Sequence, residues 1–176
     1  MKLKKHFIEN DPEMWLFVQF MYYCFIRPGE LRLLTVGAID LDEGTILIDA
    51  KISKNKKSEY VIIPPAFLQY LADTGITDCK HSDYVFSPGS HPGTEPYSKD
   101  VFNRRHKVVT KKFGYNVRYT LYSWKHTGAV DAIRAGVKIK ELQLQLRHKD
   151  LQTTDIYLRS IGINDLDDLR KNFPVL

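Results

Sequence analysis

Two β-branched runs with a lysine-rich segment between them constrain the fold of this chain most. Residues 45–50 read Thr-Ile-Leu-Ile-Asp-Ala, residues 60–64 read Tyr-Val-Ile-Ile-Pro, and residues 52–59 separate them. Short runs of this kind, bounded by polar residues, are typical of paired strands. The pattern therefore predicts a β-hairpin with a basic tip, and a short third strand over residues 84–86 is a candidate to join it.

Helical patterns flank this hairpin on both sides. Asp11 and Pro12 form a helix-start signal, with Asp as the cap and Pro at the first helical position. A strongly apolar helix is expected to follow over residues 13–26. Further helical segments are expected over residues 66–72, 98–113, 122–135, 139–147, 152–159 and 163–171. The fold class expected is α+β, mainly α-helical, with a small three-stranded antiparallel sheet.

Composition favours a soluble protein with an anionic partner. The 176 residues are 43% hydrophobic, and 26 Lys and Arg against 21 Asp and Glu give a net charge of +5. No apolar run is long enough to span a bilayer, so no membrane association is expected. Cys24 and Cys79 show no paired spacing, which disfavours a disulfide framework and a thiolate metal site and fits a reducing cytoplasm.

The basic residues are concentrated in two short segments. One is the hairpin tip, with Lys54, Lys56 and Lys57, and the other includes Arg104 and Arg105. Either segment alone would be interpreted as a solvated face. Together they favour a track for phosphate groups.

Cations also stand at fixed landmarks along the chain. Arg27 lies in Ile-Arg-Pro-Gly-Glu-Leu, Lys54 in Ser-Lys-Asn, Lys125 in Tyr-Ser-Trp-Lys-His-Thr, and Tyr157 follows His148 after nine residues. This order resembles the catalytic domain of the tyrosine recombinases, the phage integrase family. The resemblance implies the same mostly helical fold with a small sheet, and double-stranded DNA as the substrate.

The resemblance also implies a role for each cation near the hairpin. Arg27 would clamp the scissile phosphate, a task that suits a planar fork of donors, and Glu30 would orient it. Lys54 would be the general acid that protonates the departing 5′ oxygen. Lys56 remains the alternative, because the length of the hairpin varies and one sequence does not fix its register.

The C-terminal pair would carry the covalent chemistry. By the resemblance, His148 would hydrogen-bond a non-bridging phosphate oxygen and Tyr157 would be the nucleophile. A phenol attacks poorly unless its proton is removed or its anion is stabilised, and the surrounding cations would stabilise the anion. The implied reaction is a transesterification through a 3′-phosphotyrosyl intermediate, with a free 5′-hydroxyl as the other product.

The sequence departs from the family pattern at two stations. Where the family has His-x-x-Arg, this chain has Tyr122-Ser-Trp-Lys125, which keeps the charge and loses the guanidinium fork. His126 keeps the family's continuation and is interpreted as a structural histidine. Arg147 replaces a glycine, and its side chain is expected to face solvent or the DNA backbone, with compensation for Lys125 as the alternative.

These departures leave other functions open. A DNA-binding module with impaired catalysis is one, and a type IB topoisomerase-like nicking and rejoining enzyme is another. Neither a metal nor another cofactor is expected, because Arg27, Lys125 and His148 would supply the charge that a metal provides. The six histidines include no His-x-x-x-His pair, and no small-molecule substrate is expected.

The resemblance bears on the organisation of the whole protein as well. We expect residues 1–176 to form a single catalytic domain, and a fragment, because the family's N-terminal core-binding domain has no room ahead of Glu13. Residues 160–176 would be a C-terminal tail that passes to an adjacent protomer. The expected assembly is therefore a homo-multimer on DNA, with a bacterial mobile element as its source.

Overall fold

A computed structural model describes residues 2–163, which fall into two compact units, one up to Gly128 and one from Ala129 onward. The helices of the first unit begin with α1 (Lys2–Asn10), α2 (Pro12–Tyr23) and α3 (Pro28–Leu31). The elements that follow are η1 (Val36–Ala38), β1 (Ile39–Asp40), β2 (Thr45–Ile48), β3 (Glu59–Ile62), α4 (Pro65–Asp73), η2 (Ile76–Asp78), α5 (Val101–Lys112), α6 (Ser123–Arg134), α7 (Ile139–Leu146) and α8 (Leu151–Ser160).

The predicted hairpin and the predicted fold class are confirmed. Strands β2 and β3 pair antiparallel from Thr45 opposite Ile62 to Ile48 opposite Glu59. The third strand is β1, which pairs with β2. The prediction of a strand over residues 84–86 was wrong, because Tyr84 makes only isolated bridges, to Thr35 and Gly93.

The helix-start signal at Asp11 is confirmed. Its carboxylate accepts a hydrogen bond from the backbone N–H of Met14 at 3.0 Å, and Pro12 opens α2. Helix α1 was not predicted, although Leu3 and Phe7 bury one face at an i, i+4 spacing. Helix α5 starts behind Asp100 instead of Ser98. The amphipathic segment expected over residues 163–171 lies, from residue 164 onward, outside the described residues.

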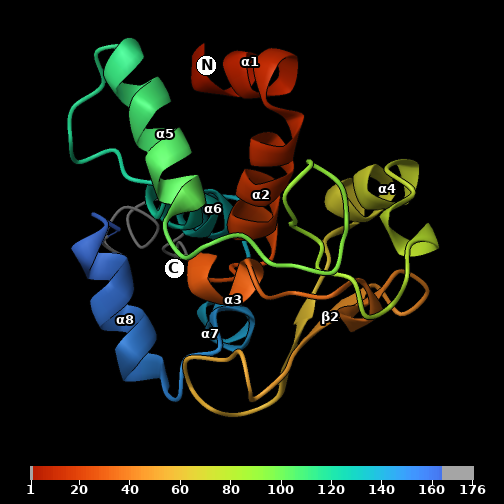
Figure 1. Cartoon of the computed structure of the whole chain (residues 1–176). Helices are drawn as coiled ribbons and strands as arrows, with labels where there is room; N and C mark the ends of the chain where they lie inside the picture. Colours follow the sequence, from red (N-terminus) through yellow and green to blue (C-terminus); the bar gives the residue numbers. More distant parts are fainter. Residues whose placement is uncertain (1, 164–176) are drawn as a thin grey trace, which may run out of the picture. The chain divides into compact units, whose positions relative to one another are not determined.

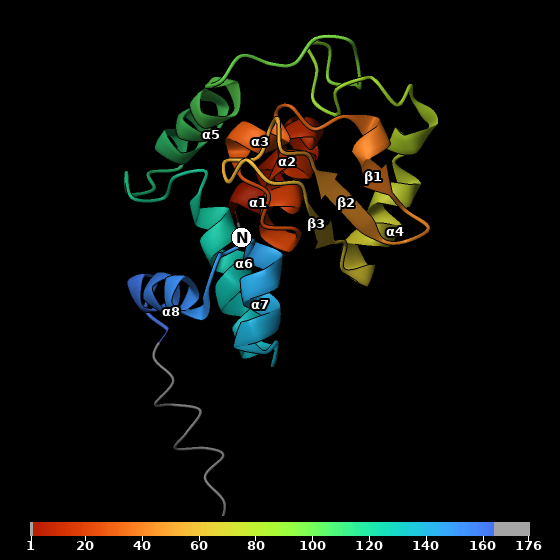
Figure 2. The same ribbon diagram turned by 90° about the horizontal axis from the view of Figure 1, so that it is seen from below.

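Helix α2 forms the centre of the first unit. In Figures 1 and 2 it lies between α5 on one side and α4 with the sheet on the other. Met14, Phe17, Val18, Phe20 and Met21 are buried, and the aromatic and apolar residues between them are partly buried, in keeping with a sequence that shows no polar face. Phe17 stacks on Phe102 of α5 with ring centroids 3.8 Å apart, and Phe20 contacts Phe67 of α4 at 5.0 Å.

In the second unit α7 packs against α8, and Figure 2 shows the two helices side by side. Leu142 and Leu146 of α7 and Leu158 of α8 supply the buried apolar surface. Among residues 2–163, no helix is long and apolar enough to cross a membrane.

Candidate functional site

The carboxylate of Glu30 holds Arg27 in place. Arg27 lies at the N-terminal cap of α3, and Glu30 is 2% exposed. One carboxylate oxygen, Oε2, accepts the backbone N–H of Arg27 at 3.1 Å. The other, Oε1, accepts Nη1 of Arg27 at 3.0 Å and the backbone N–H of Lys54 at 3.0 Å. One buried anion therefore fixes both the guanidinium and the backbone of the β2–β3 loop at Lys54.

The lysines of the β2–β3 loop differ in how they are attached. Lys54 has its backbone tied to Glu30, while its side chain reaches solvent. Lys56 is exposed and adopts a left-handed backbone with φ of 53° at the turn of the loop. Lys57 is exposed as well. Of the two candidate general acids, Lys54 is the one joined to the Arg27 network.

Tyr122, Lys125 and His126 share one face at the start of α6, as their spacing predicted. The Tyr122 ring meets the His126 ring edge-on at 5.0 Å, and Nζ of Lys125 lies 5.8 Å from the Tyr122 ring centre. Lys125 is 1% exposed and donates a hydrogen bond to the backbone carbonyl of Phe25 at 2.8 Å. Burial, and then the positive charge of Lys125, lower the pKa of His126.

His148 and Tyr157 come together in the second unit. Asp150 caps α8 by accepting the backbone N–H and the hydroxyl of Thr153, each at 2.7 Å. This cap starts the helix that carries Thr154 and Tyr157 on the side of His148. Nδ1 of His148 lies 3.0 Å from the hydroxyl of the fully buried Thr154. The His148 ring meets the half-buried Tyr157 ring edge-on at 5.6 Å.

The expectation that Arg147 faces solvent was wrong, because this residue is 3% exposed. It ends α7 in the left-handed conformation with φ of 57°. The backbone N–H of His148 donates to the carbonyl of Gln143 at 3.1 Å, a bond typical of such helix ends. The amide of Gln143 donates in return to the carbonyl of His148 at 2.9 Å.

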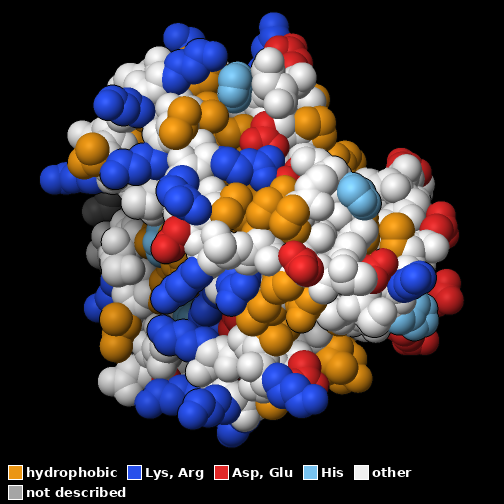
Figure 3. All heavy atoms as spheres, viewed as in Figure 1, with side chains coloured by type: hydrophobic (Ala, Val, Ile, Leu, Met, Phe, Trp, Pro, Cys, Tyr) orange, Lys and Arg blue, Asp and Glu red, His pale blue; other side chains and the backbone are white. Residues whose placement is uncertain are grey.

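The two predicted DNA-contacting arginines of α5 have different surroundings. Arg105 is half-buried and forms ion pairs with Asp11 and Glu13 at the start of α2, so it joins two helices. Figure 3 shows Lys and Arg side chains gathered over α5 and over the β2–β3 loop. The exposed basic residues of α5 are Arg104, Lys107, Lys111 and Lys112.

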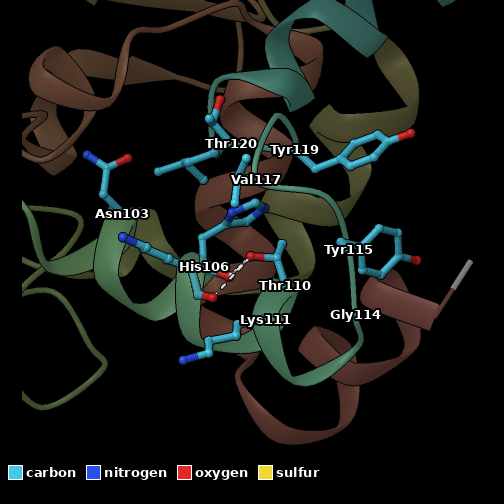
Figure 4. A pocket seen from close by; sticks show the side chains of 11 residues that line it. Asn103, His106, Thr110, Lys111, Gly114, Tyr115, Val117, Tyr119 and Thr120 are labelled. Atoms are coloured by element: carbon cyan, nitrogen blue, oxygen red, sulfur yellow. Dashed lines mark hydrogen bonds between the residues drawn. The ribbon is translucent and has the colours of Figure 1, made fainter.

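A hollow of about 660 Å³ lies between α5 and residues 114–121 (Figure 4). Its wall includes His106, Tyr115, Val117 and Tyr119. Nε2 of the buried His106 accepts a hydrogen bond from the indole N–H of Trp124 at 3.1 Å. Burial lowers the pKa of His106 to about 4, so the ring is neutral at pH 7 and can accept this bond.

Sequence reasoning missed three residues that fix the others. Thr154 and Gln143 hold His148, and the carbonyl of Phe25 holds Lys125. The Asp-x-x-Thr pattern starting at Asp150 is a helix-cap signal and could have located the start of α8. No local sequence pattern predicts the hydrogen bond between Lys125 and the carbonyl of Phe25.

Comparison with known proteins places this chain in a family. A model described as the Phage integrase family matches residues 6–161. A tyrosine recombinase of Pseudothermotoga lettingae is 29% identical over 174 residues, which are 97% of this chain and 57% of the relative. Tyrosine recombinase XerA of Saccharolobus solfataricus is 27% identical over 158 residues, 90% of this chain and 48% of that protein.

Solved structures agree on the fold. A crystal structure of XerA recombinase gives a TM-score of 0.73 at 25% identity, covering 98% of this chain and 64% of the other. The Tn1549 transposon integrase in complex with a circular intermediate DNA gives 0.70 at 15% identity, covering 97% and 62%. The chain thus spans about half to two thirds of the length of these proteins.

Proposed function

Because the chain belongs to the phage integrase family, we propose that it cuts and rejoins DNA as the catalytic part of a site-specific recombinase. The observation that carries this proposal is the pairing of His148 with Tyr157. Thr154 orients the imidazole and the Asp150 cap starts the helix that carries the phenol. A nucleophile beside a side chain that a third group orients is one signature of covalent catalysis.

In the proposed reaction the Tyr157 oxygen attacks a DNA phosphodiester. The phenol gives up its proton to solvent, and a bond forms between its oxygen and phosphorus. The bond from phosphorus to the 5′ oxygen breaks, and that oxygen takes up a proton from a lysine of the β2–β3 loop. Arg27 binds the non-bridging oxygens, since a guanidinium offers two parallel donors. His148 donates to the same phosphate. A free 5′-hydroxyl from another strand later reverses the step, so the phosphoester bond is conserved throughout.

Lys54 is our choice for the acid that protonates the 5′ oxygen. Its backbone is tied to Glu30, which also holds Arg27, so the loop and the phosphate clamp keep one geometry. Lys56 is the alternative at the tip of the same loop. General acid catalysis of this kind contributes ~10²–10⁴-fold. The exposed Lys57 and Arg104 would contact the DNA backbone.

In this proposal the protein binds double-stranded DNA and acts in the cytoplasm. Similar folds are found in recombinases and integrases solved with DNA, and the exposed basic residues of α5 and the β2–β3 loop supply the charge for it. A homo-multimer on DNA would form through the tail, residues 160–176, which lies mostly outside the described residues. Binding should weaken steeply as salt rises.

Covalent trapping tests the proposal. The protein is incubated with a nicked suicide duplex from its own element, denatured, and examined for a tyrosine-linked adduct. Tyr157→Phe should abolish the adduct and keep DNA binding. Tyr60→Phe is the matched control, because Tyr60 is 67% exposed on β3 and should leave the adduct unchanged. An adduct that persists in Tyr157→Phe contradicts the assignment.

Two other results would favour the other functions. Binding without any adduct, also when a core-binding domain is supplied in the same chain, would favour a DNA-binding module. The burial of Lys125 against a carbonyl is the observation in favour of that reading. Relaxation of supercoiled DNA by single protomers, without strand exchange, would favour a topoisomerase-like enzyme.

A further inference from the structure

The start of α6 packs closely against the end of α2. Lys125 and Gly128 lie at an i, i+3 spacing and so share one face of α6. A Cβ atom on Gly128 would come 2.1 Å from the carbonyl oxygen of Tyr22, so only glycine fits this contact. Nζ of Lys125 lies 2.8 Å from the carbonyl oxygen of Phe25. This face of α6 is therefore directed at the C-terminal end of α2.

That end of α2 needs a cation for two reasons. The last carbonyls of a helix lack partners within it and carry the negative end of its dipole. Phe25, just beyond the helix, adopts φ of 52° while buried at 4% exposure, a conformation that costs a non-glycine residue energy. An ammonium on the Phe25 carbonyl stabilises this turn by a charge-assisted hydrogen bond and places a positive charge near the negative end of α2. Arg27 follows two residues later.

We propose that Lys125 is a positioning residue for Arg27: its ammonium locks the left-handed turn at Phe25, which aims Arg27, and does not itself bind the scissile phosphate. This inference rests on the proposed function. It accounts for lysine where the family has arginine. A compact ammonium on a flexible stem can be buried against a single carbonyl, whereas a guanidinium would bring five donors in a rigid fork.

Glu30 supplies the second hold on Arg27. The carboxylate fixes the guanidinium and the backbone N–H from the α3 side, and Lys125 fixes the preceding turn from the α6 side. The turn and the cap together determine the direction in which the chain leaves α2. Loss of Lys125 should therefore act on the reaction only through Arg27.

Single-turnover cleavage of the suicide duplex tests this dependence with Lys125→Met, Lys125→Arg and Arg27→Ala. Lys125→Met should slow cleavage by ~10²-fold, comparable to losing one preorganised donor. Lys125→Arg should also be at least ~10-fold slower, since its fork does not fit the carbonyl site. In the Arg27→Ala background, Lys125→Met should change the rate by less than ~3-fold, because coupled residues are not additive.

Two results of this cycle overturn the proposal. One is an Lys125→Arg rate equal to or above that of the unsubstituted chain, which would mean that arginine serves the phosphate here as it does in the family. The other is an equal slowing by Lys125→Met with and without Arg27, which would mean an independent contact or a loss of folded protein.

Hydrogen exchange of the free protein provides a test that needs no DNA or activity. Lys125→Met should speed exchange of the amides over residues 24–31 by about 5-fold or more, because local opening becomes easier. Lys111→Met, an exposed lysine of α5, should leave them unchanged. Unchanged exchange in Lys125→Met overturns the proposal. Faster exchange with no adduct from the unsubstituted chain would keep the positioning contact and refute the proposed function instead.

Discussion

Two turns in this chain resemble each other in backbone and differ in what holds them. Phe25 with φ of 52° stands two residues before Arg27, and Arg147 with φ of 57° stands directly before His148. Each is a non-glycine residue in the left-handed region at the end of a helix, a conformation that clusters at functional sites. Each turn positions a residue, Arg27 or His148, that we propose to bind the scissile phosphate.

The anchors of the two turns are of opposite kinds. The turn at Arg147 is held by residues within the same helix end, through the mutual hydrogen bonds of Gln143 and His148. The turn at Phe25 is held by Lys125, 100 residues further along the chain. The first turn should form with its own helix, whereas the second requires the packing of α6 on α2.

The largest effect is expected at Glu30, which joins the Arg27 turn to the β2–β3 loop. Glu30→Gln leaves one acceptor oxygen for three donors, so a buried donor loses its partner and the guanidinium its counter-charge. The free energy of unfolding should fall by about 2–4 kcal/mol, and the single-turnover cleavage rate by ~10²-fold. Urea unfolding and covalent trapping measure the two effects.

The same substitution at Glu9 is the control for Glu30. Glu9 is exposed and its ion pair with Lys5 spans 3.8 Å on the surface of α1, so Glu9→Gln should change the stability by less than about 0.5 kcal/mol. Hydrogen exchange should rise in Glu30→Gln over both residues 27–31 and the β2–β3 loop around Lys54. A rise confined to residues 27–31 would mean that the loop does not depend on Glu30.

Acid should destabilise the folded chain through His106. The folded-state pKa of about 4 lies below the ordinary 6.5 because burial disfavours the charged ring. The unfolded chain therefore binds more protons between these values. The contribution of His106 is complete above pH 6.5 and is lost as the pH falls towards 4, on the order of 2 kcal/mol in all. Protonation removes the acceptor for Trp124, the neighbour of Lys125.

Unfolding measured by urea from pH 7 to pH 4 tests this sign. His106→Gln, which does not titrate, should flatten the dependence between pH 6.5 and 4. His91→Gln is the control, because His91 is exposed and its ring nitrogen Nδ1 lies 2.8 Å from the nearby carbonyl of Gly89. A pH dependence that is equally steep in both variants would assign the acid sensitivity to other groups.

The sequence predicted what local patterns encode. The hairpin followed from two β-branched runs, α2 from its Asp-Pro start, and the shared face of Tyr122, Lys125 and His126 from helical spacing. Contacts between distant segments could not be predicted. Ion pairs of Arg105 with Asp11 and Glu13 join α5 to α2, and nothing in the basic run around residue 105 distinguishes it from its exposed neighbours.

The third strand of the sheet and the partner of Lys125 were also beyond what local patterns predict. Residues 84–86 have the composition of a strand, but the edge of the sheet is taken by β1, which is brought beside β2 by a short turn with Gly44 at φ of 62°. Strand β1 is closer to β2 along the chain than residues 84–86 are, and a short connection is closed at a lower entropic cost. The side chain of Lys125 reaches the Phe25 carbonyl because Gly128 lets α6 approach the end of α2. The sequence could therefore predict a positive charge at residue 125 but not the carbonyl that it binds.

The smallest expected effect is the difference in stability between Arg147→Gly and Arg147→Ala. The same pair of substitutions at Phe25 tests directly whether the two turns are alike. Arg147→Gly and Arg147→Ala both remove the buried side chain, but only alanine keeps the cost of a left-handed backbone. The glycine variant should therefore be the more stable by about 1 kcal/mol. Phe25→Gly and Phe25→Ala should show the same difference, on top of a larger common loss from the cavity that both create. A difference at only one of the two positions would mean that the other turn relaxes once its side chain is removed. The left-handed backbone there would then be a consequence of packing and not an independent feature of the helix end.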